Sequence, residues 1–150
     1  MLRNGRRSRR DRGGAMIEFA ISLSLFFTMF FGVVNVGRAL YAYNWVSNAA
    51  RKGTRFALVR GTNCVSLQGG CPAQASDVTN YVKTFAQAID PSKLTVTTEC
   101  YASAGATAKA PPCAPGGYVQ VQVQYTFSFV SSLFPLSWTM HSSSERIVQN

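Results

Sequence analysis

Several residue types that catalytic and metal sites need are scarce in this chain of 150 residues. Its single histidine, His141, has no acid or nucleophile at a recognisable spacing, and no glycine-rich loop of the phosphate-binding kind is present. The four cysteines form no C-x-x-C pair and lie far from His141 in sequence, which argues against a zinc site. We therefore expect a protein that is not an enzyme and that uses no metal or other cofactor.

Acidic residues are also few, and the excess of basic charge is concentrated at one end. Six Asp and Glu stand against fifteen Lys and Arg, for a formal net charge of +9. Residues 1–13 hold six arginines and one aspartate, so they contribute +5 of this charge. The positive-inside rule, which keeps such an N-terminus in the cytoplasm, explains this leader better than nucleic-acid binding does. We expect membrane association and no nucleic-acid partner.

No proline occurs between Ala15 and Arg60, so one continuous helix is predicted there. Residues 15–36 carry a single charge, Glu18, and the run is long enough to cross a bilayer. It exceeds the apolar core of a secretory signal, and no A-x-A cleavage site follows it. We therefore predict a leader (1–13) and a long helix (14–60), of which 14–37 is transmembrane and 38–60 is amphipathic.

The amphipathic part of this helix has an apolar face at helical spacing. Its predicted members are Tyr41, Ala42, Trp45, Val46, Ala49, Ala50, Gly53, Phe56 and Ala57. Tyr41, Tyr43 and Trp45 also stand where an aromatic belt at the outer membrane interface is expected. Packing of this face against the sheet of the following domain is the simplest explanation for most of the stripe.

Residues 61–150 are predicted to form a small head on the far side of the membrane. A loop over 61–75 precedes a helix from an N-cap at Ser76 to Ile89, and a short strand follows over 94–99. Strict alternation over 119–129 indicates a half-buried strand. Leu136, Trp138 and Met140 indicate a final strand, with 142–144 as its polar end. The expected fold class is α+β, with a small antiparallel sheet packed on the helix.

All four cysteines lie in this head, and none lies in the leader or the apolar helix. An oxidising compartment fits this distribution. Four cysteines permit three pairings. We favour Cys64–Cys71 and Cys100–Cys113, because each bond would close a local loop rich in Gly, Pro, Ala or Ser; the other two pairings stay open.

The junction between leader and helix gives Glu18 a role. A carboxylate at mid-bilayer costs about 2.5–3.5 kcal/mol or more, so it needs a partner. Cleavage after Gly13 would free an amine on Gly14, with Glu18 four residues further along the same helix. The amine of one subunit and the carboxylate of a neighbour could then pair. Two alternatives remain open: an uncleaved single-pass protein with an envelope-binding head, and a secreted disulfide-bonded module.

Three segments together resemble the TadE-like family of pseudopilins, which belong to tight-adherence (Flp-type, type IVb-like) pilus systems of bacteria. They are GGAMIEFA (13–20), GRALY (37–41) and NAARKGTRFA (48–57). Family members have Glu as the fifth residue after cleavage, which selects the bond between Gly13 and Gly14. Phe19 stands where pilins of this class often carry Tyr.

The resemblance implies a passive minor pilin or pseudopilin that assembles in or beneath a filament for surface adhesion and biofilm formation. It implies a prepilin peptidase that removes the leader, and other pilin or pseudopilin subunits as direct partners. An inner-membrane assembly platform and a secretion ATPase would act indirectly. The chain would sit in the bacterial inner membrane with a cytoplasmic N-terminus and a periplasmic head, and could leave the cell in a pilus.

Overall fold

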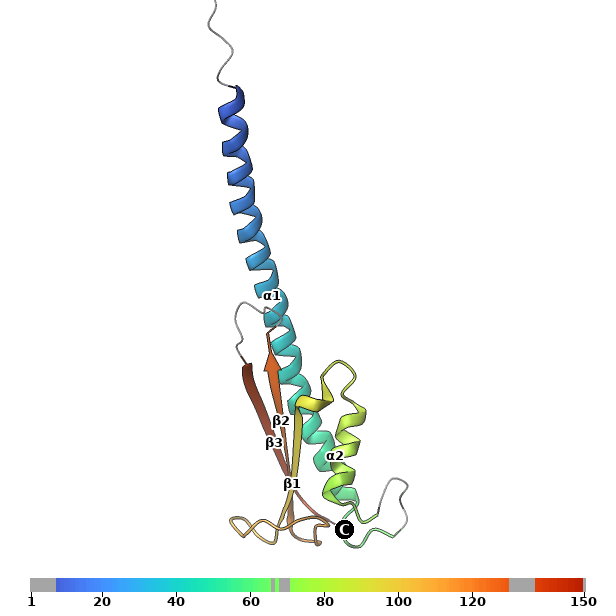
Figure 1. The fold of residues 1–150 in the computed structure, drawn as a ribbon. Helices are drawn as coiled ribbons and strands as arrows, with labels where there is room; N and C mark the ends of the chain where they lie inside the picture. Colours follow the sequence, from blue (N-terminus) through green and yellow to red (C-terminus); the bar gives the residue numbers. More distant parts are fainter. Residues whose placement is uncertain (1–7, 66, 68–70, 130–136, 150) are drawn as a thin grey trace, which may run out of the picture. The chain divides into compact units, whose positions relative to one another are not determined.

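The structure, a computed structural model, describes residues 8–65, 67, 71–129 and 137–149, without side chains for 8–12. These residues form helix α1 (Ser8–Val59), helix α2 (Ala75–Thr84), a short 3-10 helix η1 (Pro91–Lys93), and strands β1 (Leu94–Tyr101), β2 (Tyr118–Ser128) and β3 (Ser137–Ile147) (Figure 1). The chain divides into two compact units, Met1–Arg38 and Ala39–Asn150, and α1 contributes to both. The predicted α+β class, a long N-terminal helix with a small antiparallel sheet, is confirmed.

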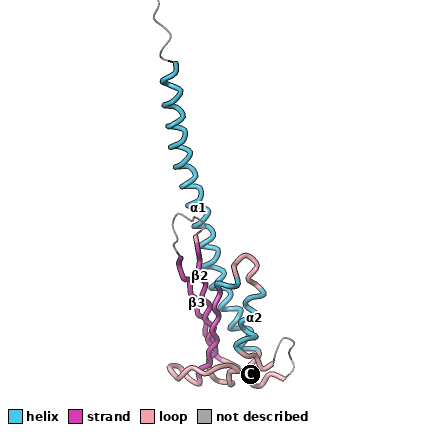
Figure 2. Tube along the Cα trace, in the orientation of Figure 1, coloured by secondary structure: helices cyan, strands magenta, loops and turns pink. Residues whose placement is uncertain are grey.

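The second unit is the head, and it has two layers. The sheet has the strand order β1-β2-β3, and both neighbouring pairs are antiparallel. It runs lengthwise beside residues 39–59 of α1, and α2 lies near the C-terminal end of that segment. Loops gather at the end of the head where the chain ends (Figure 2).

The apolar stripe predicted on α1 forms most of the contact between helix and sheet. Ala42, Val46, Ala49, Ala50 and Ala57 are buried in the core. Tyr41 is the exception, since it is 52% exposed and lies off this face. Trp45 packs against the core, and its indole N–H donates to the Phe85 carbonyl (3.1 Å), so it anchors the segment after α2.

Gly53 lies where α1 closely approaches both β2 and α2. A Cβ atom on Gly53 would stand 3.1 Å from Val121 Cγ1 and 3.1 Å from Val82 Cγ2. Because these contacts are tighter than ordinary van der Waals distances, the absence of a side chain allows α1 to pack against β2 and α2 together.

Strand β2 is half-buried, as the alternation of its residues predicts. Its inner face, Val119, Val121, Val123, Tyr125 and Phe127, is buried against the helices. Its outer face carries Gln120, Gln122, Gln124 and Thr126, which are half-buried. In an antiparallel ladder, residues in register share a face, so the inner face continues into β1 and β3. Most inner residues of β1 are buried, whereas on β3 only Met140 is.

Helix α2 is shorter than its sequence pattern predicts and begins earlier. Its N-cap is Gln74 rather than Ser76, because the Asp77 carboxylate reaches back to accept the Gln74 N–H (2.9 Å). The helix ends at Thr84 and does not continue to Ile89. The N–H groups of Phe85 and Ala86 bond three residues back (3.2 and 3.1 Å), which tightens and closes the last turn.

Strand β3 is longer than predicted, and the interpretation of 142–144 as its end is wrong. Pairing continues without a bulge from Ser137 opposite Ser128 to Ile147 opposite Tyr118, because the backbone ladder forms whatever the side chains are. Of the predicted apolar residues, Met140 is buried, Trp138 is 63% exposed, and Leu136 lies outside the described residues.

The two edges of the sheet differ. The end of β1 is covered, because Cys100 exchanges two backbone hydrogen bonds with Lys109 (2.8 Å each). Along β3, every second residue directs its N–H and C=O away from β2, and no described strand pairs with them. Among the described residues, β3 is therefore a regular, open edge of eleven residues.

Candidate assembly segment and disulfides

The apolar half of α1 exposes its hydrophobic side chains. Over Gly13–Val59 the helix is long and apolar enough to cross a membrane by length and composition. Within this stretch Phe19 is 67% exposed, and neighbouring residues of the same kind, among them Ile17, Leu25 and Met29, are similarly open. A surface of this kind requires lipid or protein around it.

Phenylalanine rings form two stacked pairs along this helix. Phe26 stacks on Phe30 (centroids 6.2 Å apart), and Phe27 stacks on Phe31 (6.1 Å). All four side chains are exposed. The pairs follow from the spacing of four residues, which places side chains one above the other on a helix.

Gly13 and Gly14, the predicted cleavage pair, both lie inside α1. A Cβ atom added at either glycine would meet no atom within 4 Å. The fold of the described chain therefore imposes no steric demand for glycine at these positions. If glycine is required at these positions, the requirement comes from another molecule that binds this segment.

Glu18 differs from three of the other polar groups of the apolar helix. The side chains of Ser24, Thr28 and Asn35 donate to the carbonyls four residues back (2.8, 2.8 and 3.0 Å), so they satisfy themselves within the helix. An ionised carboxylate has no hydrogen to donate, and the backbone N–H groups around it are used by the helix. Glu18 is exposed, and no described side chain pairs with it.

The four cysteines form two disulfides in the pairs that the sequence favours. Cys64 and Cys71 have Cα atoms 5.6 Å apart, and Cys100 and Cys113 have Cα atoms 5.3 Å apart. Cys100 and Cys113 are buried in the core, and the Cys113 carbonyl accepts the Thr62 N–H (3.1 Å). The second disulfide therefore joins β1 to its following loop, and the Thr62 hydrogen bond attaches that loop to the chain that leaves α1.

Thr54 is a structural residue that the sequence pattern did not single out. It is buried, and its hydroxyl lies 2.9 Å from the Ala50 carbonyl and 3.0 Å from the Ser144 carbonyl. It therefore connects α1 with β3. Its position four residues after Ala50, on the apolar stripe, is the signal that could have identified it.

These features define a class of protein with a pilin-like layout: a long N-terminal apolar helix that continues into a small, disulfide-bonded α+β head. Residues 13–55 match the family model described as TadE-like protein, and the resemblance inferred from sequence is confirmed over this segment. The matched segment lies within α1 and includes no part of the sheet. Comparison with curated proteins and with solved structures gave no significant match.

Proposed function

We propose that this chain is a minor pilin or pseudopilin of a tight-adherence, type IVb-like pilus, and that it acts as a subunit without catalytic activity. A prepilin peptidase would cut between Gly13 and Gly14. The helix would hold the protein in the bacterial inner membrane with the head in the periplasm, and the subunit would assemble in or beneath a filament that serves adhesion and biofilm formation.

One observation carries this proposal: the apolar, exposed helix contains a single carboxylate without a described partner, placed four residues after Gly14. The matched family segment covers the cleavage pair, this carboxylate and the apolar helix together. When apolar helices pack side by side, water leaves, and a lone buried charge is strongly penalised unless an opposite charge pairs with it. The new amine of a neighbouring subunit provides that charge.

The variant Glu18→Ala tests the pairing. We expect normal membrane insertion, leader removal and disulfide formation, but loss of incorporation into filaments. The measurement is piliation and surface adherence of cells whose only copy carries the change, with the amount and intact mass of the protein determined in parallel. Ser22→Ala, an exposed polar site one turn along the same helix, is the matched control and should assemble normally.

Two results would contradict the proposal. If cells with normal amounts of mature Glu18→Ala protein form normal filaments, Glu18 does not pair with the amine of a neighbouring subunit during assembly. If the intact mass of the wild-type protein still includes the leader from Met1 in cells with an active prepilin peptidase, an uncleaved membrane protein with an envelope-binding head is favoured.

A further inference from the structure

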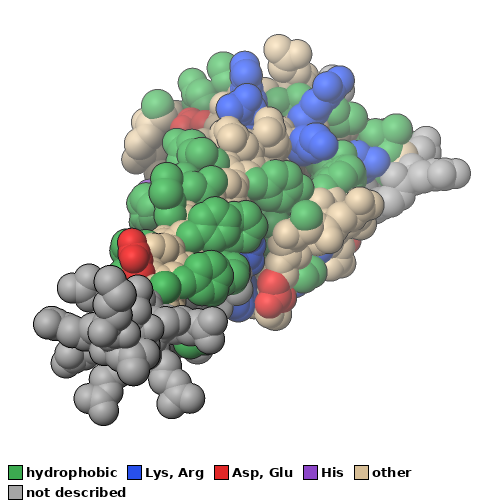
Figure 3. All heavy atoms as spheres, turned by 90° about the horizontal axis from the view of Figure 1, so that it is seen from above, with side chains coloured by type: hydrophobic (Ala, Val, Ile, Leu, Met, Phe, Trp, Pro, Cys, Tyr) green, Lys and Arg blue, Asp and Glu red, His purple; other side chains and the backbone are tan. Residues whose placement is uncertain are grey.

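Basic and aromatic side chains together line a groove between α1 and α2. The basic groove, as we name it, has the cations Lys52, Arg55 and Arg60 and the aromatic residues Phe56, Tyr81 and Phe85, and it encloses about 490 Å³. In Figure 3, several Lys and Arg side chains lie close together on one side of the view, with hydrophobic side chains between them.

The aromatic residues fix the positions of two of the cations. Phe56 stacks on Tyr81 (centroids 4.2 Å apart), and Tyr81 meets Phe85 edge to face (4.9 Å). Arg60 lies over the Phe56 ring at 4.0 Å, and Lys52 lies over the Phe85 ring at 4.5 Å. Such contacts hold a cation in place. The third cation, Arg55, is exposed and has no described partner.

Two carboxylates lie in one row across the sheet. Glu99 on β1 and Glu145 on β3 both pair in register with Gln120 on β2, so the three residues form the acidic row. Neighbouring strands are about 4.8 Å apart, which separates the two carboxylate positions by about 10 Å. The row lies on the outer face of the sheet, because it shares the face of Gln120 rather than that of the buried valines.

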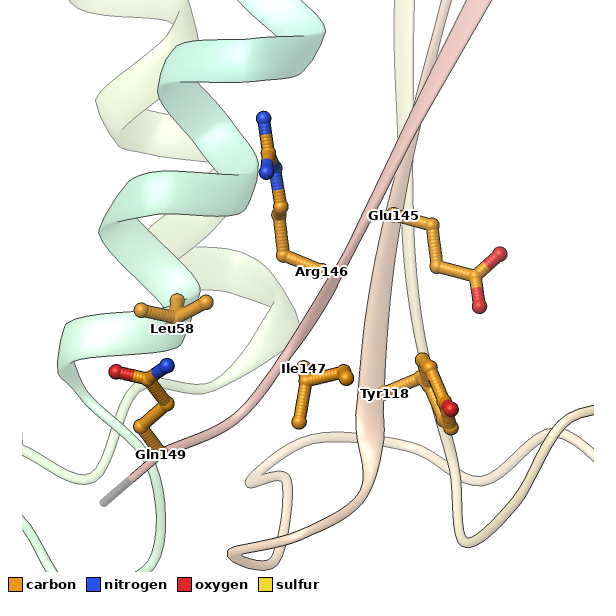
Figure 4. A pocket seen from close by; sticks show the side chains of 6 residues that line it. All are labelled: Leu58, Tyr118, Glu145, Arg146, Ile147 and Gln149. Atoms are coloured by element: carbon orange, nitrogen blue, oxygen red, sulfur yellow. The ribbon is translucent and has the colours of Figure 1, made fainter.

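Glu99 is held in position, whereas Glu145 is open. The Tyr101 hydroxyl donates to Glu99 Oε2 (2.5 Å), and this hydrogen bond raises the pKa of Tyr101 above its usual value. Glu145 is exposed and has no described partner. In Figure 4 its side chain points away from α1, opposite to the side chain of Arg146.

The basic groove and the acidic row lie on opposite faces of the head, at the same end. Leu58 of α1 lines a pocket with Tyr118 and Glu145, and it lies within one helical turn of Arg55 and Arg60. The groove belongs to the helical layer, and the row belongs to the outer face of the sheet. Each head therefore presents positive charge on one side and negative charge on the other at one level.

We propose that the basic groove of one copy binds the acidic row of a second copy, with Arg55 paired to Glu145 of that copy and Lys52 close to its Glu99. This inference rests on the proposed function. A contact between two different faces is heterologous, so it repeats from copy to copy. Because the two sites lie at one level, successive heads keep the same direction, as subunits anchored in one membrane must. Head-to-head contact through two grooves is excluded by like charge.

The test uses the full-length mature chain in detergent, with self-association measured by sedimentation velocity at low salt. Arg55→Glu and Glu145→Arg should each weaken association about tenfold, because each places like charges opposite one another. The double variant restores opposite charges and should return association to within about threefold of wild type. Arg51→Glu is the matched control: it makes the same charge change on α1 outside the groove, and Arg51 bonds only Ser47 (2.9 Å) among the described residues.

A second measurement locates the contact. In a mixture of copies with light and heavy nitrogen, a zero-length carbodiimide reagent should join Lys52 of one copy to Glu145 or Glu99 of another. Equal effects of Arg55→Glu and Arg51→Glu, failure of the double variant to restore association, or the absence of these mixed-isotope cross-links would overturn the inference.

These outcomes are separate from those that test the proposed function. If the cross-links are absent but the protein still enters filaments in cells, the proposed contact between heads is wrong and the proposed function stands. If the cross-links form and the double variant restores association, but the protein never enters a filament, the pilus function is wrong and the contact between heads stands.

Discussion

Gly53 should tolerate alanine and reject leucine. An added Cβ would lie 3.1 Å from a methyl carbon of Val121 and 3.1 Å from one of Val82. Overpacking a core costs about 1–3 kcal/mol, whereas replacing glycine by alanine inside a helix gains about 1 kcal/mol. Gly53→Ala should therefore lower the free energy of unfolding by about 0–2 kcal/mol. Gly53→Leu adds three further carbon atoms to a filled space and should cost about 3 kcal/mol or more.

Tryptophan fluorescence is a suitable reporter, because both tryptophans, Trp45 and Trp138, belong to the head unit. At about 4 °C per kcal/mol, thermal unfolding of Gly53→Leu in detergent should begin more than about 10 °C below wild type. Gly37→Leu is the matched control, since it makes the same change on the same helix where no atom lies within 4 Å of the added Cβ. If the two leucine variants unfold at the same temperature, the close approach of α1 to β2 and α2 is wrong.

Two further predictions concern polar groups of the head, both measured by the same thermal unfolding. Thr98 is 6% exposed, and its hydroxyl has no described hydrogen-bond partner, so Thr98→Val should raise the free energy of unfolding by about 1 kcal/mol; a lower melting temperature would show that the hydroxyl is satisfied. The hydroxyl and the N–H of Ser92 donate to Asp90 Oδ1 (2.7 and 3.0 Å) and lower the pKa of Asp90 from its usual 3.8. Because the pKa of Asp90 is lower in the folded chain than in the unfolded chain, ionised Asp90 stabilises the fold at a pH above its unfolded pKa. This stabilisation is lost as the pH falls through its folded pKa. Asp90→Asn should therefore show a smaller drop in melting temperature between about pH 6 and about pH 3, and an unchanged drop would contradict this role.

The parts of the fold that sequence predicted correctly are those with a strong local period. The alternation over β2 identified its buried face, and the stripe on α1 identified most of the residues that meet the sheet. In both cases one face is buried and the other is not, so the pattern records the environment directly.

The sequence-based predictions were wrong where tertiary contacts determine where an element ends. Ile89 is buried like a helical core residue but lies beyond the end of α2, so periodicity alone placed it in the helix. β3 continues past its serines because β2 offers a full ladder of backbone partners, which no property of the serines reveals. The basic groove joins side chains from two helices that are separate in sequence, and neither segment indicates the other.

The regularity of β3 has a consequence for the head once it is separated from its anchor. Open edges of this kind promote aggregation, and two copies of β3 can pair symmetrically only in the antiparallel sense. Residues 39–59 of α1 run lengthwise beside the sheet, so such pairing would direct the two helices in opposite ways. Under the proposed membrane anchoring, neighbouring copies enter the bilayer from one side, which disfavours antiparallel pairing of their heads, whereas free fragments that begin near Ala39 are under no such constraint. The anchor would thus protect the head from its own edge strand, and soluble fragments would lose that protection.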